Sequence, residues 1–388
     1  MGEAAATYRI ATIPGDGVGP DVVRAARAVV DAAGVGFGFT VEWSEHLAGG
    51  ASIDANGVAI RPDDVEACGA SDAILLGAVG GPKWSDPSAP VRPEQALFAL
   101  RGGLGLYANL RPVTVHPALI PSSPLRPELL EGVDLLIVRE LTGGVYFGER
   151  EEAGPAGGGH ERRAVDTGPY TETEVRRVVE LAFELAAARR SHVTSVDKAN
   201  VLATSRLWRT VANEVGAGHP HVTLAHQLVD SCAMLLVKQP AAFDVIVTEN
   251  LFGDILSDEA AVLAGSLGML PSASLGARRT AHGTFGLYEP IHWSAPDIAG
   301  RDLANPTGTV LSAAMMLRLS LGRDDAASAI EGAVGAALDH GFRTADLVPS
   351  GGDSAGGVRR VGTAEMTAAI VARIAIPEAA RETAAARK

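Results

Sequence analysis

The chain is poor in the features that mark secreted and membrane-bound proteins. Its 388 residues include only two cysteines, Cys68 and Cys232, which are too few for a disulfide framework and lack metal-site spacing. No run of 18 apolar residues is present, so we expect no membrane span. The first residues lack the basic start and apolar core of a signal peptide. Together these features predict a cytoplasmic protein.

Positive charge is also scarce. At pH 7, 33 Lys and Arg residues face 46 Asp and Glu residues, which gives a formal net charge of −13. Such an excess argues against nucleic acid and against an anionic membrane surface as partners. An anionic small molecule can still bind, provided that a few arginines gather at one place.

What the chain does have is apolar sequence, 47% of its residues, and enough length for two domains. Short apolar runs bounded by turn residues alternate with helical patterns, which is typical of an α/β fold. The glycines at 157–159 predict a loop tip or an arm. The expected strands are 8–13, 73–76, 135–138, 193–196 and 245–247, and the expected helices are 21–33, 172–190, 201–215, 229–237, 254–264, 307–321, 325–338 and 363–374.

A glycine-rich loop at residues 15–20 (Gly-Asp-Gly-Val-Gly-Pro) lies between the first strand and the first helix. Its position resembles that of the dinucleotide-binding fingerprint, but its spacing is G-x-G-x-G and a proline follows. No acidic residue clearly ends a second strand at the expected distance. We therefore interpret it as a tight turn at a helix start and not as a Rossmann motif.

Two carboxylates in segment 249–258 (Glu-Asn-Leu-Phe-Gly-Asp-Ile-Leu-Ser-Asp) carry the strongest chemical signal. Asp254 and Asp258 are four residues apart, so on a helix they stack on one face and repel each other unless a cation lies between them. A divalent ion such as Mg²⁺ or Mn²⁺, which prefers oxygen ligands, suits that position. The alternative is a solvated acidic start of a helix, where Asp is common.

Three arginines are candidates for holding an anionic substrate: Arg101, Arg111 and Arg139. Arg139 directly follows the expected strand 135–138, which places it at the carboxyl edge of the sheet, where α/β proteins bind ligands. Guanidinium groups bind carboxylates through two parallel hydrogen bonds. The alternative, which a single arginine taken alone favours, is a structural ion pair.

Lys198 and Tyr146 are candidates for proton transfer. Lys198 follows the expected strand 193–196, where partial desolvation and nearby cations would lower its pKa and make it a base. Pairing with Asp197 is its structural alternative. Tyr146 can donate a phenolic proton or simply pack as an aromatic. Asp230 precedes an apolar helix, where capping is the ordinary role.

A loop punctuated by proline and glycine, residues 288–306, contains His292, Asp297 and Asn305. Such a loop can hold adenosine without a Rossmann turn. The alternative is an ordinary surface loop.

Taken together, these segments resemble the β-decarboxylating dehydrogenases, the family that acts on 3-isopropylmalate, isocitrate, homoisocitrate, malate and tartrate. The likeness extends from about residue 8 to residue 374. It rests on seven segments in the same order: 13–17 (Ile-Pro-Gly-Asp-Gly), 76–84, 109–112 (Asn-Leu-Arg-Pro), 138–144, 195–201, 249–258 and 294–300. This order favours the functional interpretation of the residues above over their structural alternatives.

The resemblance implies a two-domain α/β fold that is not a Rossmann fold, with the active site in the cleft between the domains. Residues 1–106 plus 265–388 would form the first domain, with the cofactor loop. Residues 107–264 would form the second, with the metal site, the dimer interface and an arm around 145–170.

The resemblance also implies the site residues. Tyr146 and Lys198 are the catalytic acid and base, and Asp230, Asp254 and Asp258 bind Mg²⁺ or Mn²⁺. Arg101, Arg111, Arg139, Asp230, Leu97 and Phe98 bind the substrate. Glu94, Asn200, Glu289, His292, Ser294, Ala295, Asp297, Ile298, Ala304 and Asn305 bind the cofactor. Lys198 and Asp230 would enter the site from the partner subunit of a homodimer.

Three positions narrow the expected reaction. Leu97 and Phe98, within a helical turn of Arg101, offer an apolar wall that suits an isopropyl group, whereas desolvating a third carboxylate there would be costly. Asp297 can accept hydrogen bonds from both adenosine ribose hydroxyls and would repel a 2′-phosphate, which favours NAD over NADP. We therefore expect NAD- and metal-dependent oxidative decarboxylation of (2R,3S)-3-isopropylmalate to 4-methyl-2-oxopentanoate and CO₂, a step of leucine biosynthesis.

Other interpretations stay open. The substrate could be another 3-alkylmalate, D-malate, tartrate or homoisocitrate, and Trp293, which stands where relatives have glycine, keeps a specialised paralogue in view. A non-catalytic regulatory subunit is opposed by the presence of Tyr146, Lys198 and the three aspartates. A metal-dependent hydrolase would form no NADH.

Overall fold

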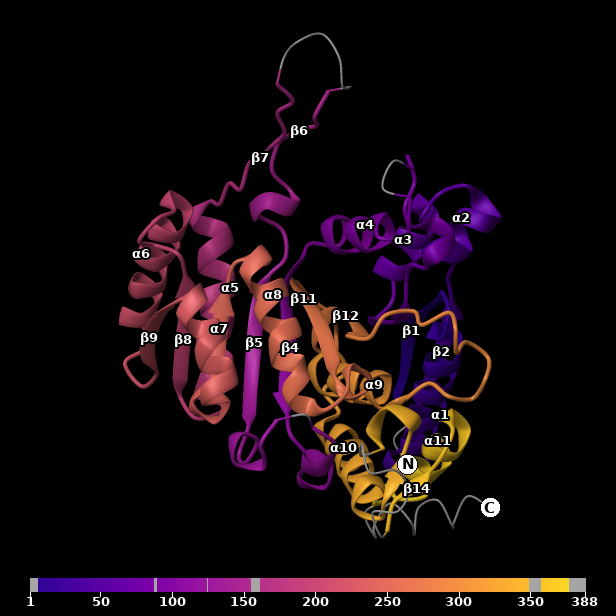
Figure 1. Cartoon of the computed structure of the whole chain (residues 1–388). Coiled ribbons are helices and arrows are strands. Elements are labelled where there is room, and N and C mark those ends of the chain that lie inside the picture. Colours follow the sequence, from indigo (N-terminus) through magenta and orange to yellow (C-terminus); the bar gives the residue numbers. More distant parts are fainter. Residues whose placement is uncertain (1–5, 87–88, 124, 155–160, 349–356, 377–388) are drawn as a thin grey trace. The chain divides into compact units, whose positions relative to one another are not determined.

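The structure, a computed structural model, describes residues 6–86, 89–123, 125–154, 161–348 and 357–376. The chain divides into two compact units. Figure 1 shows the elements of both, coloured by residue number. One consists of Met1–Leu106, Thr114–Glu128 and Ala261–Lys388, and the other of Tyr107–Val113 and Leu129–Ala260. Each unit combines strands with helices, so the predicted α/β class is confirmed.

The first unit is built on a sheet with the strand order β2-β1-β3-β12-β11. β1 runs parallel to β2 and to β3, β3 runs parallel to β12, and β12 runs antiparallel to β11. The strands are β1 (Ala6–Gly15), β2 (Phe39–Glu45), β3 (Ala73–Ala78), β11 (Pro271–Arg279) and β12 (Thr284–Pro290). Only β1 and β3 were predicted, since the other three lack a continuous apolar run.

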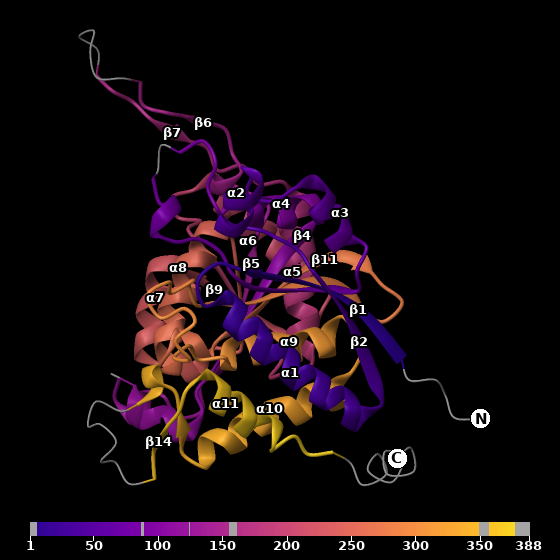
Figure 2. The same ribbon diagram turned by 90° about the vertical axis from the view of Figure 1, so that its right-hand side faces the viewer.

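Both faces of this sheet are covered by helices. Alternate residues of neighbouring strands, such as Ala11, Ile74 and Leu287, belong to one apolar cluster with Leu100 of the helix α4. The helices of this unit are α1 (Gly19–Phe37), α2 (Gly50–Asn56), α3 (Pro62–Gly69), α4 (Gln95–Gly103), α9 (Thr307–Leu319), α10 (Asp324–Asp339) and α11 (Thr363–Val371). Of these, α1 contacts β1 and β3, and α9 contacts β3 and β12. Figure 2 shows α1 in front.

The glycine-rich loop forms the tight turn that its spacing predicted. Gly15 and Gly17 have φ of +72° and +57°, which favours glycine. Between them the buried carboxylate of Asp16 accepts hydrogen bonds of 2.7 Å from the backbone N–H groups of Gly50, Ala51 and Gly80. The turn therefore ties the start of α2 and the end of β3 to the start of α1.

The second unit has the strand order β4-β5-β10-β8-β9. β5, β10, β8 and β9 pair in parallel. The strands are β4 (Leu106–Thr114), β5 (Asp134–Glu140), β8 (His192–Asp197), β9 (Thr223–Leu228) and β10 (Val245–Thr248), and the helices are α5 (Glu172–Ala187), α6 (Ala203–Ala217), α7 (Val229–Lys238) and α8 (Asn250–Ala261). The predicted helices of this unit are all present, with ends shifted by a few residues.

Two short strands, β6 (Arg150–Glu151) and β7 (Val165–Asp166), pair antiparallel within the region predicted to be an arm. The predicted tip at 157–159 lies outside the described residues. In the described part of the chain, no helix is both long and apolar enough to cross a membrane.

The parallel pairing of β5, β10 and β8 determines where the polar residues after these strands lie. Thr248 at the end of β10 is in register with Arg139 of β5 on one side and with Val196 of β8 on the other. Parallel strands present their carboxyl ends at the same edge of the sheet. Arg139, the start of α8 and Lys198 therefore share one edge.

Candidate active site

Helix α8 carries the two carboxylates predicted from sequence, and each is paired with an arginine. Arg139 Nη1 forms a short ion pair with Asp254 Oδ1, and Arg111 Nη1 lies 3.0 Å from Asp258 Oδ1. The arginine side chains are only 6% and 12% exposed, whereas those of Asp254 and Asp258 are 36% and 58% exposed. The two cations offset the repulsion between carboxylates one helical turn apart.

Tyr146, at the end of the short 3-10 helix Gly144–Tyr146, completes the group around Asp254. Its hydroxyl donates a 2.8 Å hydrogen bond to Asp254 Oδ2, and the Arg139 guanidinium lies 5.8 Å from its ring centre. Burial, aided by that hydrogen bond, raises the pKa of Tyr146 to about 12. The phenol therefore keeps its proton at neutral pH and can act as a donor.

Sequence reasoning missed the residue that orients Arg139. The Asn250 side chain, at the start of α8, accepts hydrogen bonds from Arg139 Nε (3.1 Å) and Nη2 (2.8 Å) and donates one from Nδ2 to the Gly143 carbonyl (3.1 Å). Gly253 leaves room for the arginine, because a Cβ there would lie 2.5 Å from Arg139 Cγ. Both residues stand in the segment that carries the carboxylates, and the spacing of four residues between Asn250 and Asp254 placed these two on one helix face.

Lys198 and Asp230 form a separate pair. Lys198 Nζ lies 2.7 Å from Asp230 Oδ1, and this hydrogen bond lowers the pKa of the Asp230 carboxyl. Asp230 is in the first turn of α7, whose N-cap is Leu228, so the expected capping role does not apply. Asp197 instead pairs with Arg209, which leaves Lys198 to Asp230.

The donor set on α8 suits a hard divalent cation. Its ligand atoms would be carboxylate oxygens, and Mg²⁺ is commonly held by one or two carboxylates plus substrate and water. Among the described residues of a single chain, no three His, Cys, Asp or Glu side chains gather into a metal-binding group. One chain thus offers Asp254 and Asp258 as candidate ligands.

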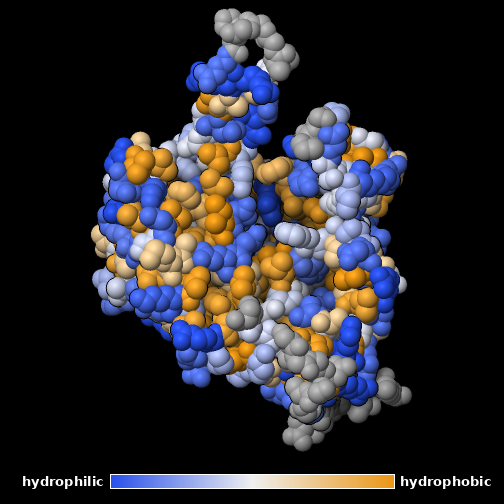
Figure 3. Space-filling model, in the orientation of Figure 1, coloured by the Kyte–Doolittle hydropathy of each residue, from blue (hydrophilic) through white to orange (hydrophobic). Residues whose placement is uncertain are grey.

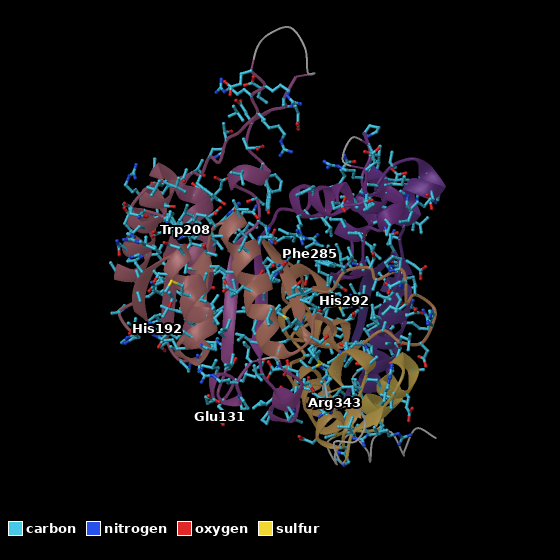
Figure 4. The ribbon with its side chains drawn as sticks, in the orientation of Figure 1. Glu131, His192, Trp208, Phe285, His292 and Arg343 are labelled. Carbon is cyan, nitrogen blue, oxygen red and sulfur yellow. The ribbon has the colours of Figure 1, made fainter. Side chains whose placement is uncertain are left out.

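The first unit contains a cavity of about 790 Å³, a size typical of small-molecule sites. Its lining includes most of the residues predicted to bind the cofactor: Glu94, His292, Ser294, Ala295, Asp297, Ile298, Ala304 and Asn305. Figure 4 shows His292 on the loop that follows β12. The predicted adenosine loop therefore lines this cavity.

His292 offers this cavity an acceptor. Its Nδ1 lies 2.9 Å from the Trp293 carbonyl, and since a carbonyl only accepts, Nδ1 carries the proton. Burial lowers the pKa of His292, so the ring is neutral and Nε2 keeps its lone pair. Nε2 is inaccessible to water and has no partner among the described residues. A buried acceptor without a partner fits a bound ligand that donates a hydrogen bond.

The remaining predicted residues have contacts of their own. Arg101 Nη2 forms a 2.6 Å ion pair with the buried Glu289 of the same unit. Phe98 is 44% exposed, whereas Leu97 packs against the apolar cluster under the sheet. Asn200 is an exposed residue of the second unit.

Comparison with known proteins identifies the family. Residues 9–370 match the family described as isocitrate/isopropylmalate dehydrogenase. The chain belongs to this family. It is accordingly an enzyme of the β-decarboxylating dehydrogenase class, as its motifs predicted.

Relatives and solved structures agree with this assignment. The chain is 58% identical to a 3-isopropylmalate dehydrogenase of Anaeromyxobacter dehalogenans over 87% of this chain and 94% of that one. It is 55% identical to a 3-isopropylmalate dehydrogenase of Moorella thermoacetica over 92% and 97%. The crystal structure of an isocitrate dehydrogenase from Methylococcus capsulatus has a TM-score of 0.80 at 34% identity and covers 95% of this chain and 99% of that one. A β-decarboxylating dehydrogenase from Thermococcus kodakarensis has a TM-score of 0.74 at 38% identity, over 95% and 96%.

The role of Asn250 can be tested by substitution. Asn250→Ala removes the acceptor for two buried Arg139 N–H groups, so we expect it to destabilise the protein by about 1–3 kcal/mol in urea denaturation. The exposed Asn200→Ala should change stability by less than about 0.5 kcal/mol. Equal midpoints for wild type and Asn250→Ala would show that Asn250 does not hold Arg139.

Proposed function

We propose that the protein catalyses the NAD- and divalent-cation-dependent oxidative decarboxylation of (2R,3S)-3-isopropylmalate to 4-methyl-2-oxopentanoate and CO₂, a step of leucine biosynthesis. The observation that carries this is the group on α8: Asp254 and Asp258, each paired with a largely buried arginine, beside a tyrosine that keeps its proton. This group offers acidic, cationic and proton-donating atoms to one substrate. Relatives named 3-isopropylmalate dehydrogenase at 50–58% identity support the choice of substrate.

The arginines of the site would exchange partners when substrate binds. Arg139 and Arg111 hold carboxylates of α8 in the free chain, and a dicarboxylate substrate offers them two replacements. Asp254 and Asp258 would then hold Mg²⁺ or Mn²⁺. No buried guanidinium is left unpaired in either state, which avoids the cost of an uncompensated buried charge.

Proton transfer is assigned to Lys198 and Tyr146. The bound cation would polarise the C2 hydroxyl and its adjacent carboxylate, and the nicotinamide ring would accept hydride from C2. Lys198 takes the hydroxyl proton as C2 is oxidised. After CO₂ leaves from the β carbon, Tyr146, which is protonated at neutral pH, donates a proton to that carbon.

A homodimer would supply a third carboxylate. The side chain of Asp230 is 65% exposed, and Met234 and Val237, at helical spacing from it on α7, are 70% and 46% exposed. Ile255 of α8 is 57% exposed, and Figure 3 shows apolar side chains gathered over these helices. A second copy covering this apolar surface could bring its Asp230 and Lys198 to the α8 carboxylates.

Substrate and cofactor choice rest on Phe98, Leu97 and Asp297. The partly exposed Phe98 and its neighbour Leu97 suit an alkyl group and not a third carboxylate. Asp297 lines the cavity and favours NAD, since a carboxylate repels a 2′-phosphate.

Measuring NADH formation tests the proposal. With Mg²⁺ or Mn²⁺ and NAD, we expect 3-isopropylmalate to be preferred over D-malate by roughly 10–200-fold in kcat/KM, the usual scale for an apolar pocket. Isocitrate, tartrate and homoisocitrate should also be poorer substrates, NADP should be the poorer cofactor, and excess chelator should abolish turnover. A higher kcat/KM for isocitrate or D-malate would refute the proposed substrate. A preference for NADP would refute the proposed cofactor, and full activity in chelator would refute the requirement for a metal.

The phenol of Tyr146 can be tested separately. Tyr146→Phe removes the proton donor but keeps the ring beside Arg139, so kcat should fall by at least ~10²-fold with little change in KM for NAD. Tyr107→Phe, which removes a hydroxyl from β4 of the same unit, is the control and should retain activity within about twofold. Wild-type kcat in Tyr146→Phe would exclude the hydroxyl from the reaction.

A further inference from the structure

The loop after β12 is held by hydrogen bonds to two other segments, the start of α1 and the start of α11. The Ser294 carbonyl accepts a 2.7 Å hydrogen bond from the Val18 N–H, and the Gly300 N–H donates one of 2.8 Å to Asp21 Oδ2. The Ala304 carbonyl accepts one of 2.6 Å from Thr363 Oγ1. Side chains on this loop are therefore presented to the cavity from a fixed backbone.

Trp293 is the most exposed large apolar side chain of the described residues, at 77%, and it lines the cavity. The other three tryptophans have partners for their indole N–H groups: Asp31 for Trp43, Asp54 for Trp84 and Ser195 for Trp208. No such partner for Trp293 is found in the described part of the chain. Its indole is thus free to be covered by a ligand.

The backbone at this position does not require glycine. Among the described non-glycine residues, positive φ occurs at Ser191, Ala295 and Asp302, and Trp293 is not one of them. A Cβ and a ring at residue 293 therefore cause no backbone strain. The tryptophan is accommodated by the loop, and its exposure is not the result of a distorted backbone.

The surroundings of Trp293 restrict what can cover it. An indole offers a flat π face, which prefers a planar partner. The same cavity is lined by Asp297 and Asp346, whose carboxylates disfavour an anionic ring. It is also lined by His292, a neutral ring whose Nε2 acceptor has no partner among the described residues, which favours a ring with an N–H donor. A neutral purine with an exocyclic amine meets all three conditions.

We propose that Trp293 stacks on the adenine ring of the dinucleotide and thereby strengthens binding of the adenosine half of the cofactor. This inference rests on the proposed function, because it assumes that the cavity holds NAD. Trp293 acts only on binding of the cofactor and has no part in the bond-making steps. Loss of the stacked ring should weaken binding by about 10-fold, within the range measured for base–aromatic stacking.

The test compares Trp293→Gly and Trp293→Phe with wild type, using ADP-ribose as the probe of the adenosine half and nicotinamide mononucleotide as the probe of the other. By calorimetry, Trp293→Gly should raise the Kd for ADP-ribose about 10-fold and leave that for nicotinamide mononucleotide unchanged, while Trp293→Phe keeps most of the affinity. The KM for NAD should rise in parallel, with kcat and the KM for 3-isopropylmalate within about twofold of wild type. Equal thermal midpoints of the three proteins establish that the variants are folded.

Tryptophan fluorescence gives a second reading. ADP-ribose should quench wild type and Trp43→Phe, whose replaced indole lies outside the cavity, but should not quench Trp293→Phe to the same extent. An unchanged Kd for ADP-ribose in Trp293→Gly, with NADH still formed by the wild type, overturns the stacking alone. Failure of wild type to bind ADP-ribose overturns both the stacking and the cofactor role of the cavity.

Discussion

The carboxylates of Asp254 and Asp258, one helical turn apart on α8, would repel each other without nearby positive charge. Two strands of the second unit each place an arginine side chain beside one of them. Arg139 comes from the end of β5 and Arg111 from β4, and both are largely buried where they meet Asp254 and Asp258. Buried guanidinium groups must be paired in every state of the protein. A site made of such pairs can accept a cationic and an anionic ligand together. The metal cation takes the place of the arginines beside the aspartates, and the substrate anion takes the place of the aspartates beside the arginines.

This arrangement is compatible with the proposed anionic substrate in a chain whose net charge is −13. Positive charge is concentrated at the carboxyl edge of one sheet, and there it is neutralised internally. The cavity of the first unit uses the opposite chemistry, with a neutral histidine, an exposed indole and mostly apolar neighbours. The two chemistries match the two halves of the proposed reaction, a charged acid and a largely neutral adenosine.

The sequence predicted the α/β class and the helix under Asp254 and Asp258, because helical spacing and strand-end positions are local properties. It could not choose between an arginine that clamps substrate and one that forms a structural ion pair, and Arg139 and Arg111 prove to be ion-paired in the free chain. Asn250 stood in the quoted segment, but its role depends on the register of β5 against β10. The same limit applies to Arg101, whose partner Glu289 is 188 residues away.

The exchange of partners at α8 is tested most directly by titrating Mn²⁺ and following the free ion by electron paramagnetic resonance, with and without 3-isopropylmalate. The account predicts that substrate tightens Mn²⁺ binding at least about fivefold, that Mn²⁺ tightens substrate binding by the same factor, and that Asp254→Asn loses the effect. Mn²⁺ binding that is equal with and without substrate, or unaffected by Asp254→Asn, would contradict it.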